Sequence, residues 1–346
     1  MIFTHQLMIP RPTNRPAIAR VADFPEEHGV QLQLRQLQHF ESLYRLRSFV
    51  QAAREHTLTQ SALSRSLQKL ESELGERLFD RTTHAVEPTA AADALIQRAR
   101  DVIDSMLAFE EEAQQLRGGA TGHVRVGTGP YPAQPLLTGA ISSLSGKHHG
   151  IQVSVVAGLA RDLLTALLRR DLDFVVCDMS KYEDSPAAED IEVIELPREP
   201  LVLVLSADHP FLEDPIDLAE LAAYPWAMPT PAPIQARDLP RPFAEALASG
   251  RFPFYRLETT AACLELVKAG RAITMVPRSL GHEVCADGSL VLRETPANLR
   301  TNDGIHLIRQ RSKSTSTRLL IEEIVDAAAK LADASANRSR GRLDSN

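Results

Sequence analysis

Ser48–Glu71 reads SFVQAAREHTLTQSALSRSLQKLE and contains two short helical patterns separated by a tight break. In the second pattern leucines recur at spacings of four, three and four residues, which places them on one face of a helix. They are Leu63, Leu67, Leu70 and Leu74. The opposite face carries amides, hydroxyls and cations: Gln60, Ser61, Ser64, Arg65, Gln68 and Lys69. Side chains of these kinds hydrogen-bond to base edges and phosphates in the DNA major groove. The stretch therefore predicts a helix that binds DNA.

The residues around this stretch predict a winged helix-turn-helix domain over 32–88. Apolar residues from Leu34 to Tyr44 have the spacing of a first helix, and Ser48 and Thr59 are suitable N-caps for the second and third helices. Gly75 is placed to end the third helix, because glycine readily adopts the left-handed conformation found after a helix C-terminus. The segments 77–81 and 85–88 then predict a two-stranded wing.

A long linker helix is predicted over 89–117, with Thr89 as its N-cap. Its apolar residues alternate at spacings of three and four along the whole length: Ala92, Leu95, Ala99, Val102, Met106, Phe109, Ala113 and Leu116. This is the pattern of a coiled-coil seam, so we expect a homodimer. The residues expected at its interface are Leu95, Ala99, Val102, Met106 and Phe109. The alternative is an amphipathic helix that packs on its own domain. Glycines in 118–122 predict a hinge.

From residue 123 to residue 333, short apolar strands alternate with helices, which predicts two α/β lobes. Strands at 124–126, 153–156 and 174–177 read as buried members of a parallel sheet. Further strands are expected at 201–205, near Trp226, at 273–276 and at 305–308. The predicted lobe I comprises 123–200 and 305–333, and lobe II comprises 201–304. A cleft between two lobes is a natural site for a small ligand.

Length and composition limit the remaining possibilities. The chain has 346 residues and a formal net charge of −7, which argues against indiscriminate coating of nucleic acid. From Arg45 to Arg81, however, seven basic residues outnumber five acidic ones. Three cysteines without metal-ligand spacing predict no disulfide framework and no metal site, and they suit a reducing cytoplasm. No apolar run approaches a membrane span, and we expect disordered extensions at 1–31 and 334–346.

Leu34 to Thr89 resembles the DNA-binding domain of LysR-type transcriptional regulators. The phrases that carry the resemblance are Thr59-Gln60-Ser61-Ala62-Leu63-Ser64, Leu67, Leu70-Glu71, Leu74-Gly75, Leu78-Phe79-Asp80-Arg81 and Thr89. Weaker similar phrases follow in order to about residue 333, such as Leu172-Asp173 and Val276-Pro277. The resemblance implies a periplasmic-binding-protein-like effector domain and a homodimer or homotetramer with antiparallel linker helices. It also implies double-stranded promoter DNA, a small-molecule co-inducer and RNA polymerase as partners.

Each residue of the predicted DNA surface has an expected contact. Thr59 caps the helix and can reach phosphate, Gln60 and Ser61 can reach base edges, and Arg65 can offer a fork to guanine. Ser64 and Lys69 are expected at phosphates. Arg81 on the wing is expected in the minor groove or at the backbone. The alternative for each is a solvated surface side chain.

The predicted effector site lies where strands end. Thr128-Gly129-Pro130-Tyr131 follows the first strand of lobe I and precedes a helix that we expect near 135–144. Backbone N–H groups at such a helix start can hold an anion, with the Thr128 hydroxyl as a further donor. Thr230 and Pro231 follow the Trp226 strand, and Thr259-Thr260 caps a helix across the cleft. The alternative is ordinary turn and capping chemistry.

Other functional classes have less support. The sequence lacks a nucleophile elbow, a dinucleotide or P-loop glycine pattern and a zinc-protease motif, so we expect neither an enzyme nor a cofactor. A solute-binding protein would explain two lobes but not a winged helix. A DNA-binding regulator without a functional effector pocket is the other alternative. The sequence favours a DNA-binding regulator controlled by a small molecule.

Overall fold

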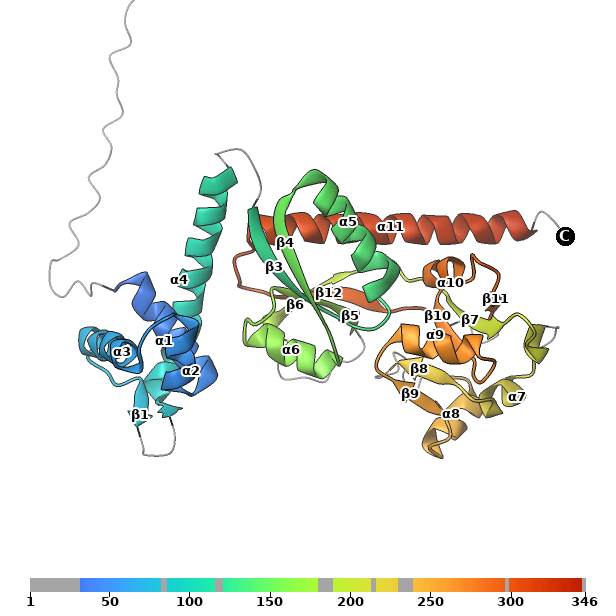
Figure 1. Cartoon of the computed structure of the whole chain (residues 1–346), viewed down its shortest axis with the longest axis horizontal. Coiled ribbons are helices and arrows are strands. Elements are labelled where there is room, and N and C mark those ends of the chain that lie inside the picture. The colour runs from blue at the N-terminus through green and yellow to red at the C-terminus, as the bar shows by residue number, and fades with distance from the viewer. Residues whose placement is uncertain are drawn as a thin grey trace, which may run out of the picture.

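The computed structural model describes residues 32–81, 86–115, 121–179, 189–212, 216–229, 239–295 and 299–343. The expected N-terminal extension, Thr230, Pro231 and most of the expected hinge lie outside these ranges. The chain forms a small helical domain, an upright linker helix and two α/β lobes in a row (Figure 1).

The N-terminal domain is the predicted winged helix-turn-helix. It comprises α1 (Leu34–Leu46), α2 (Phe49–Glu55), α3 (Gln60–Leu74), β1 (Phe79–Arg81) and β2 (Val86–Pro88). The Ser48 and Thr59 hydroxyls accept backbone N–H groups of the first turns of α2 and α3, and Gly75 (φ 73°) ends α3, all as predicted. The two strands pair antiparallel. Leu63, Leu67 and Leu70 of α3 are completely buried in one core with Phe40 of α1, and Leu74 is partly buried against it. This packing leaves the opposite face of α3 toward solvent.

The linker helix α4 (Ala90–Gln115) starts at the Thr89 cap, as predicted. Its first half packs on the winged helix domain, because Ala92, Ile96 and Ala99 are all at most 6% exposed in that core. The C-terminal half carries exposed apolar side chains instead. The predicted seam is therefore divided between an intradomain contact and a free stripe.

Lobe I is built on a five-stranded sheet in the order β4-β3-β5-β12-β6. The strands are β3 (Thr121–Thr128), β4 (Gly150–Ala157), β5 (Phe174–Asp178), β6 (Ile191–Glu195) and β12 (Asp303–Ile308). β3, β4 and β5 are parallel, as predicted, whereas β12 is antiparallel to both β5 and β6. The expectation that 153–156 is buried was wrong, because β4 lies at the edge of the sheet and Val155 and Val156 are exposed. The helices are α5 (Thr138–Lys147), α6 (Ala160–Leu168) and α11 (Thr315–Leu343), with an irregular turn η1 (Ala133–Leu137) before α5. β3 begins inside the expected hinge.

Lobe II has a three-stranded antiparallel sheet and a two-stranded parallel pair. The first contains β7 (Leu201–Ser206) between β10 (Thr274–Pro277) and β11 (Leu290–Glu294), and the second joins β8 (Ala227–Pro229) to β9 (Tyr255–Leu257). Its helices are α7 (Leu218–Ala223), α8 (Arg241–Ala248), α9 (Thr260–Lys268) and α10 (Arg278–Val284), with a 3-10 turn η4 (Pro210–Leu212). Trp226 anchors the core, with its indole N–H donating to the Leu221 carbonyl.

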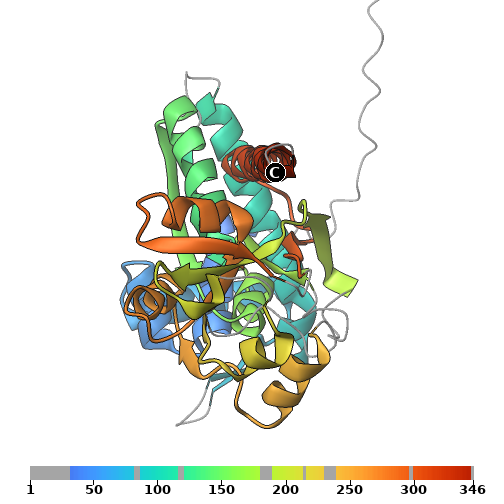
Figure 2. The same cartoon turned by 90° about the vertical axis from the view of Figure 1, so that its right-hand side faces the viewer.

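The chain crosses between the lobes twice, as predicted, and the two crossing segments meet at a bridge between Pro200 and Arg300. The sequence did not predict β6, β9, α10 or β11, which are short. The C-terminal prediction was wrong: α11 continues to Leu343, whereas we expected disorder from Ala334. The helix runs past lobe I toward the far end of the molecule and is seen nearly end-on in Figure 2.

Candidate DNA interface and effector cleft

The outer face of α3 combines exposure with donor groups. Gln60, Ser61 and Arg65 are exposed, and Ser64 is half-buried. Within the described part of the chain, Arg65 makes no hydrogen bond or ion pair, so its guanidinium is available to a ligand. Lys69 is also exposed and lies 3.7 Å from Glu73 one turn later. An exposed pair of this kind contributes little and can exchange its partner for a phosphate.

Thr59 has a structural role beside its predicted one. Its Oγ1 accepts the Ala62 N–H at 3.2 Å and lies 3.1 Å from the Ser61 hydroxyl. The cap therefore fixes the first turn of α3, which carries Gln60 and Ser61. Nothing is described of the Arg81 side chain, whose backbone belongs to β1.

Glu71 is a positioning residue that the sequence analysis did not assign. Its carboxylate accepts the backbone N–H groups of Leu78 at 2.9 Å and Phe79 at 3.3 Å. The last turns of α3 are thereby tied to the first strand of the wing. The only hint in the sequence is its place seven residues before Leu78, and no local rule links a helix carboxylate to a strand that follows a glycine.

The exposed half of α4 is the remaining part of the predicted dimer surface. Val102 is 51% exposed, Met106 38% and Phe109 64%. Leu95 is half-buried against the winged helix core, and Ala99 belongs to that core. The assignment of Ala99 to a dimer contact is therefore corrected, because its methyl group is already covered by its own domain.

The loop after β3 differs from the expected anion site. The Gly129 N–H donates to the Val176 carbonyl at 2.9 Å, and the Thr128 hydroxyl donates to the Gly129 carbonyl at 3.0 Å. The helix expected near 135–144 is present, but the loop does not lead straight into it, since Gln134 has extended dihedral angles and regular helix begins at Thr138. The donors that we expected to face an anion are thus used within the protein.

Instead, this loop joins the two lobes. The Tyr131 hydroxyl donates to the Met275 carbonyl on β10 of lobe II, and the Thr260 hydroxyl of α9 donates to the Pro130 carbonyl at 3.4 Å. Tyr131 is 3% exposed, and burial is the main cause that raises the pKa of its phenol. The neighbouring Thr259 caps α9 through the Ala262 N–H, as expected.

Carboxylates gather where the chain crosses between the lobes. Asp178 and Asp303 are direct cross-strand neighbours on β5 and β12. Burial, with the charges of Asp178 and Glu199, raises the pKa of Asp303 to about 7. The Glu199 carboxylate accepts the N–H and the hydroxyl of Ser279 at 2.9 and 3.0 Å, which connects the crossing segment to α10. No pattern in the sequence predicts this group, because its members are far apart in the chain.

Comparison with known proteins agrees with this architecture. Residues 34–93 match the family described as bacterial regulatory helix-turn-helix protein, lysR family, and residues 117–329 match the LysR substrate binding domain. The chain is 32% identical to the SDS degradation transcriptional activation protein of a Pseudomonas strain, over 88% of this chain and 99% of that protein.

Solved full-length structures share the fold. LysG from Corynebacterium glutamicum, determined with bound effector Arg, has a TM-score of 0.58 at 21% identity and covers 86% of this chain and 99% of LysG. CbnR in complex with its target DNA has a TM-score of 0.50 at 19% identity and covers 87% of this chain and all of CbnR.

The winged helix-turn-helix and the two-lobed domain together define a DNA-binding transcriptional regulator with an effector-binding domain. The chain belongs to the LysR family of these regulators. This membership favours the regulator over the solute-binding alternative. LysR regulators bind promoter DNA and form oligomers. Within the described segments, no helix has the length and apolar character needed to cross a membrane.

Proposed function

We propose that α3 reads base edges of a promoter in the major groove and that the wing holds the adjacent backbone. The exposed donor face of α3 carries this proposal, because its leucines are buried on the other side and cannot rotate outward. In this arrangement Gln60, Ser61 and Arg65 contact bases. Thr59, Ser64 and Lys69 contact phosphates, and Arg81 contacts the minor groove or backbone.

The oligomer is proposed to pair through the free stripe of α4. Val102, Met106 and Phe109 expose apolar surface on one side of the helix, which a second α4 would cover. Two copies of the winged helix domain would then read two half-sites. The same proposal includes the association of two such dimers into a homotetramer as the alternative to a homodimer.

The effector is proposed to bind between the lobes, near Thr128, Gly129, Pro130 and Tyr131. Tyr131 of this group lies at the junction of the lobes, and Thr230 and Pro231 follow β8 of lobe II in the sequence. Because Tyr131 and Thr260 already hydrogen-bond across the junction, ligand entry would replace these direct contacts. We infer that the resulting lobe movement changes how the DNA-bound oligomer contacts RNA polymerase.

We also infer that the protein acts in the cytoplasm and by binding rather than by catalysis. Its relatives are regulators of transcription, and its DNA target lies in that compartment. Detection of the intact chain in a periplasmic fraction would contradict the inference.

The deciding experiment is selection of genomic DNA fragments by the purified full-length protein. Arg65→Ala is run beside it, with Arg161→Ala on α6 as the matched control, because Arg161 is also a strongly exposed arginine. We expect enrichment of a partly palindromic site by the wild type and the control. The Arg65 variant should lose about 1–3 kcal/mol of specific binding. If all three proteins select DNA with equal specificity, the proposal that Arg65 of α3 contacts bases is refuted.

A further inference from the structure

The linker helix carries two carboxylates outside its free apolar stripe. Asp101 and Asp104 are one turn apart, and with about 100° per residue Asp104 lies opposite Val102, Met106 and Phe109, whereas Asp101 lies roughly a quarter turn from Val102 and Phe109. The acidic side can therefore bind the chain's own lobe I while the apolar stripe is left for a second copy.

Arg170 of lobe I receives both carboxylates. One terminal nitrogen lies 2.7 Å from Asp101, the other contacts Asp104, and the Arg170 side chain is only 6% exposed. Among the described residues its Nε has no hydrogen-bond partner, so its charge depends on the α4 carboxylates. Losing these carboxylates would leave a poorly solvated cation.

The backbone at Arg170 also indicates a specific role. The residue follows the end of α6 with φ 63°, a left-handed position at which glycine is usual. Its N–H donates to the Leu167 carbonyl at 2.9 Å, as at an ordinary helix end. Any residue other than glycine is disfavoured in this conformation, so the helix end by itself gives no reason for an arginine at position 170. The ion pairs with Asp101 and Asp104 of α4 give that reason.

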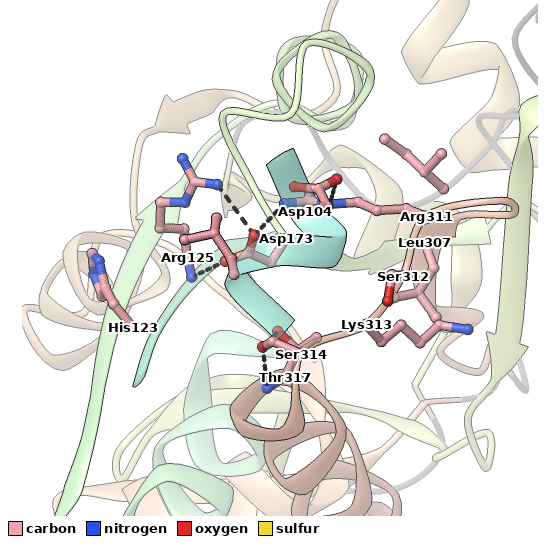
Figure 3. Close-up of a pocket in the computed structure, with 12 residues that line it drawn as sticks. Asp104, His123, Arg125, Asp173, Leu307, Arg311, Ser312, Lys313, Ser314 and Thr317 are labelled. Carbon is pink, nitrogen blue, oxygen red and sulfur yellow. Dashed lines mark hydrogen bonds and ion pairs between the residues drawn. The ribbon is translucent and has the colours of Figure 1, made fainter. Parts of the chain in front are cut away.

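Arg311 provides the second connection, from the loop between β12 and α11. Its Nε lies 3.1 Å from Asp104, and its other nitrogens donate to the Leu172 carbonyl and to Asp173, both at 2.8 Å. Asp173 also accepts the backbone and side chain of Arg125 on β3. Figure 3 shows Asp104 and Asp173 beside the Arg311 guanidinium, with Arg125 on the other side of Asp173.

The surroundings of this contact are polar rather than closely packed. A cavity of about 370 Å³ lies between α4, β3 and the start of α11, and its lining includes Arg125, Arg311 and Lys313. A second of about 500 Å³ lies between the winged helix domain and lobe I, where Arg45 approaches Asp171 at 3.8 Å. An interface that depends on charges beside open cavities can separate without exposing a large apolar core.

We propose that Asp101 and Asp104 of α4, with Arg170 and Arg311 of lobe I, form an interdomain latch. When closed, the latch holds the linker helix and the winged helix domain in the position seen here. When it opens, lobe I moves relative to α4, and the spacing of the DNA-binding domains in an oligomer changes. The regulatory meaning of the latch rests on the proposed function, whereas the latch itself is a property of the protein alone.

The test measures the distance between α4 and lobe I in the full-length protein by double electron–electron resonance. Spin labels are placed at Ala94→Cys and Arg161→Cys, with Cys285→Ser to remove the half-buried native thiol. The other two cysteines are at most 2% exposed. Labelled chain is diluted into unlabelled chain, so that only distances within one chain contribute.

In the wild type we expect one narrow distance distribution. Asp101→Asn combined with Asp104→Asn should make a longer distance the major population. Arg170→Met should do the same, and all three changes together should add little because they remove the same contacts. Glu110→Gln removes one exposed charge from the same helix and should leave the wild-type distribution.

If the aspartate variant or Arg170→Met is folded and gives the wild-type distribution, the latch is refuted. Using two variants from opposite sides of the contact guards against one failing to fold, which circular dichroism detects. The readout needs no DNA, so a failed DNA selection with a shifted distance would overturn the proposed function and leave the latch standing.

Discussion

Replacing Asp303 with asparagine should stabilise the protein at neutral and alkaline pH. The carboxyl group lies beside Asp178 and Glu199, and burial with these charges raises its pKa from the ordinary value of an aspartate, near 3.8, to about 7. The folded state therefore disfavours the ionised form. The neutral carboxyl makes its full contribution below about pH 4, and this contribution is lost as the pH rises through 7.

The magnitude follows from the difference in pKa between the unfolded and folded states. A shift of about three units corresponds to about 4 kcal/mol of lost stability at pH 8, as an upper bound. Because the Asp303 side chain keeps some solvent contact, we expect roughly half of this value. Asparagine is neutral at every pH and does not suffer the loss.

The assay is urea unfolding of the full-length protein between pH 5 and pH 8, with the fluorescence of Trp226 in the core of lobe II as the measure of unfolding. The advantage of Asp303→Asn over the wild type should grow with pH and level off above pH 7. Asp326→Asn, an exposed site on α11, is the matched control and should show no such trend. An advantage that is constant with pH, or that is largest at pH 5, would refute the electrostatic reasoning.

Three further predictions concern the DNA-binding half. Leu67→Ala should destabilise the winged helix domain by about 2–5 kcal/mol in urea unfolding, because Leu67 is completely buried; an unchanged midpoint would contradict the core assignment. Glu71→Ala should weaken DNA binding at unchanged helix content, whereas Glu71→Gln keeps an acceptor for the wing and should retain most affinity. Equal losses of affinity in the two variants would mean that the negative charge of Glu71, and not its hydrogen bonds to the wing, supports DNA binding. Phe109→Asp should yield monomers in sedimentation at concentrations where Glu110→Gln is dimeric, and a dimer of the Phe109 variant would reject the α4 stripe.

The sequence predicted the winged helix domain most completely, because its signals are local. Thr59 and Gly75 set the ends of α3, and the leucine spacing decides which face is buried. The parallel strands of lobe I were also found, since each is a short segment rich in valine and only one polar residue interrupts the first and second of them. Short elements such as β9 and α10 were missed because a few residues carry too little periodicity to distinguish them from loops.

At the predicted effector loop, local sequence did not predict the hydrogen-bond partners. The residue types from Thr128 to Tyr131 suggested free donors before a helix. The Thr128 hydroxyl instead donates to the adjacent Gly129 carbonyl. The Gly129 N–H and the Tyr131 hydroxyl donate to the Val176 and Met275 carbonyls, which are far away in the chain. A local pattern identifies a donor but not the acceptor that tertiary contacts bring to it.

The sequence by itself determined that this protein has a winged helix-turn-helix with buried leucines, a long linker helix and two α/β lobes. These features follow from periodicity and capping, which act over a few residues. Only the tertiary structure decided that Ala99 is covered by its own domain, that Asp303 meets Asp178, and that Arg170 holds Asp101 and Asp104. The physical reason is that burial and ion pairing depend on which distant segments become neighbours, and no spacing within one segment encodes that choice.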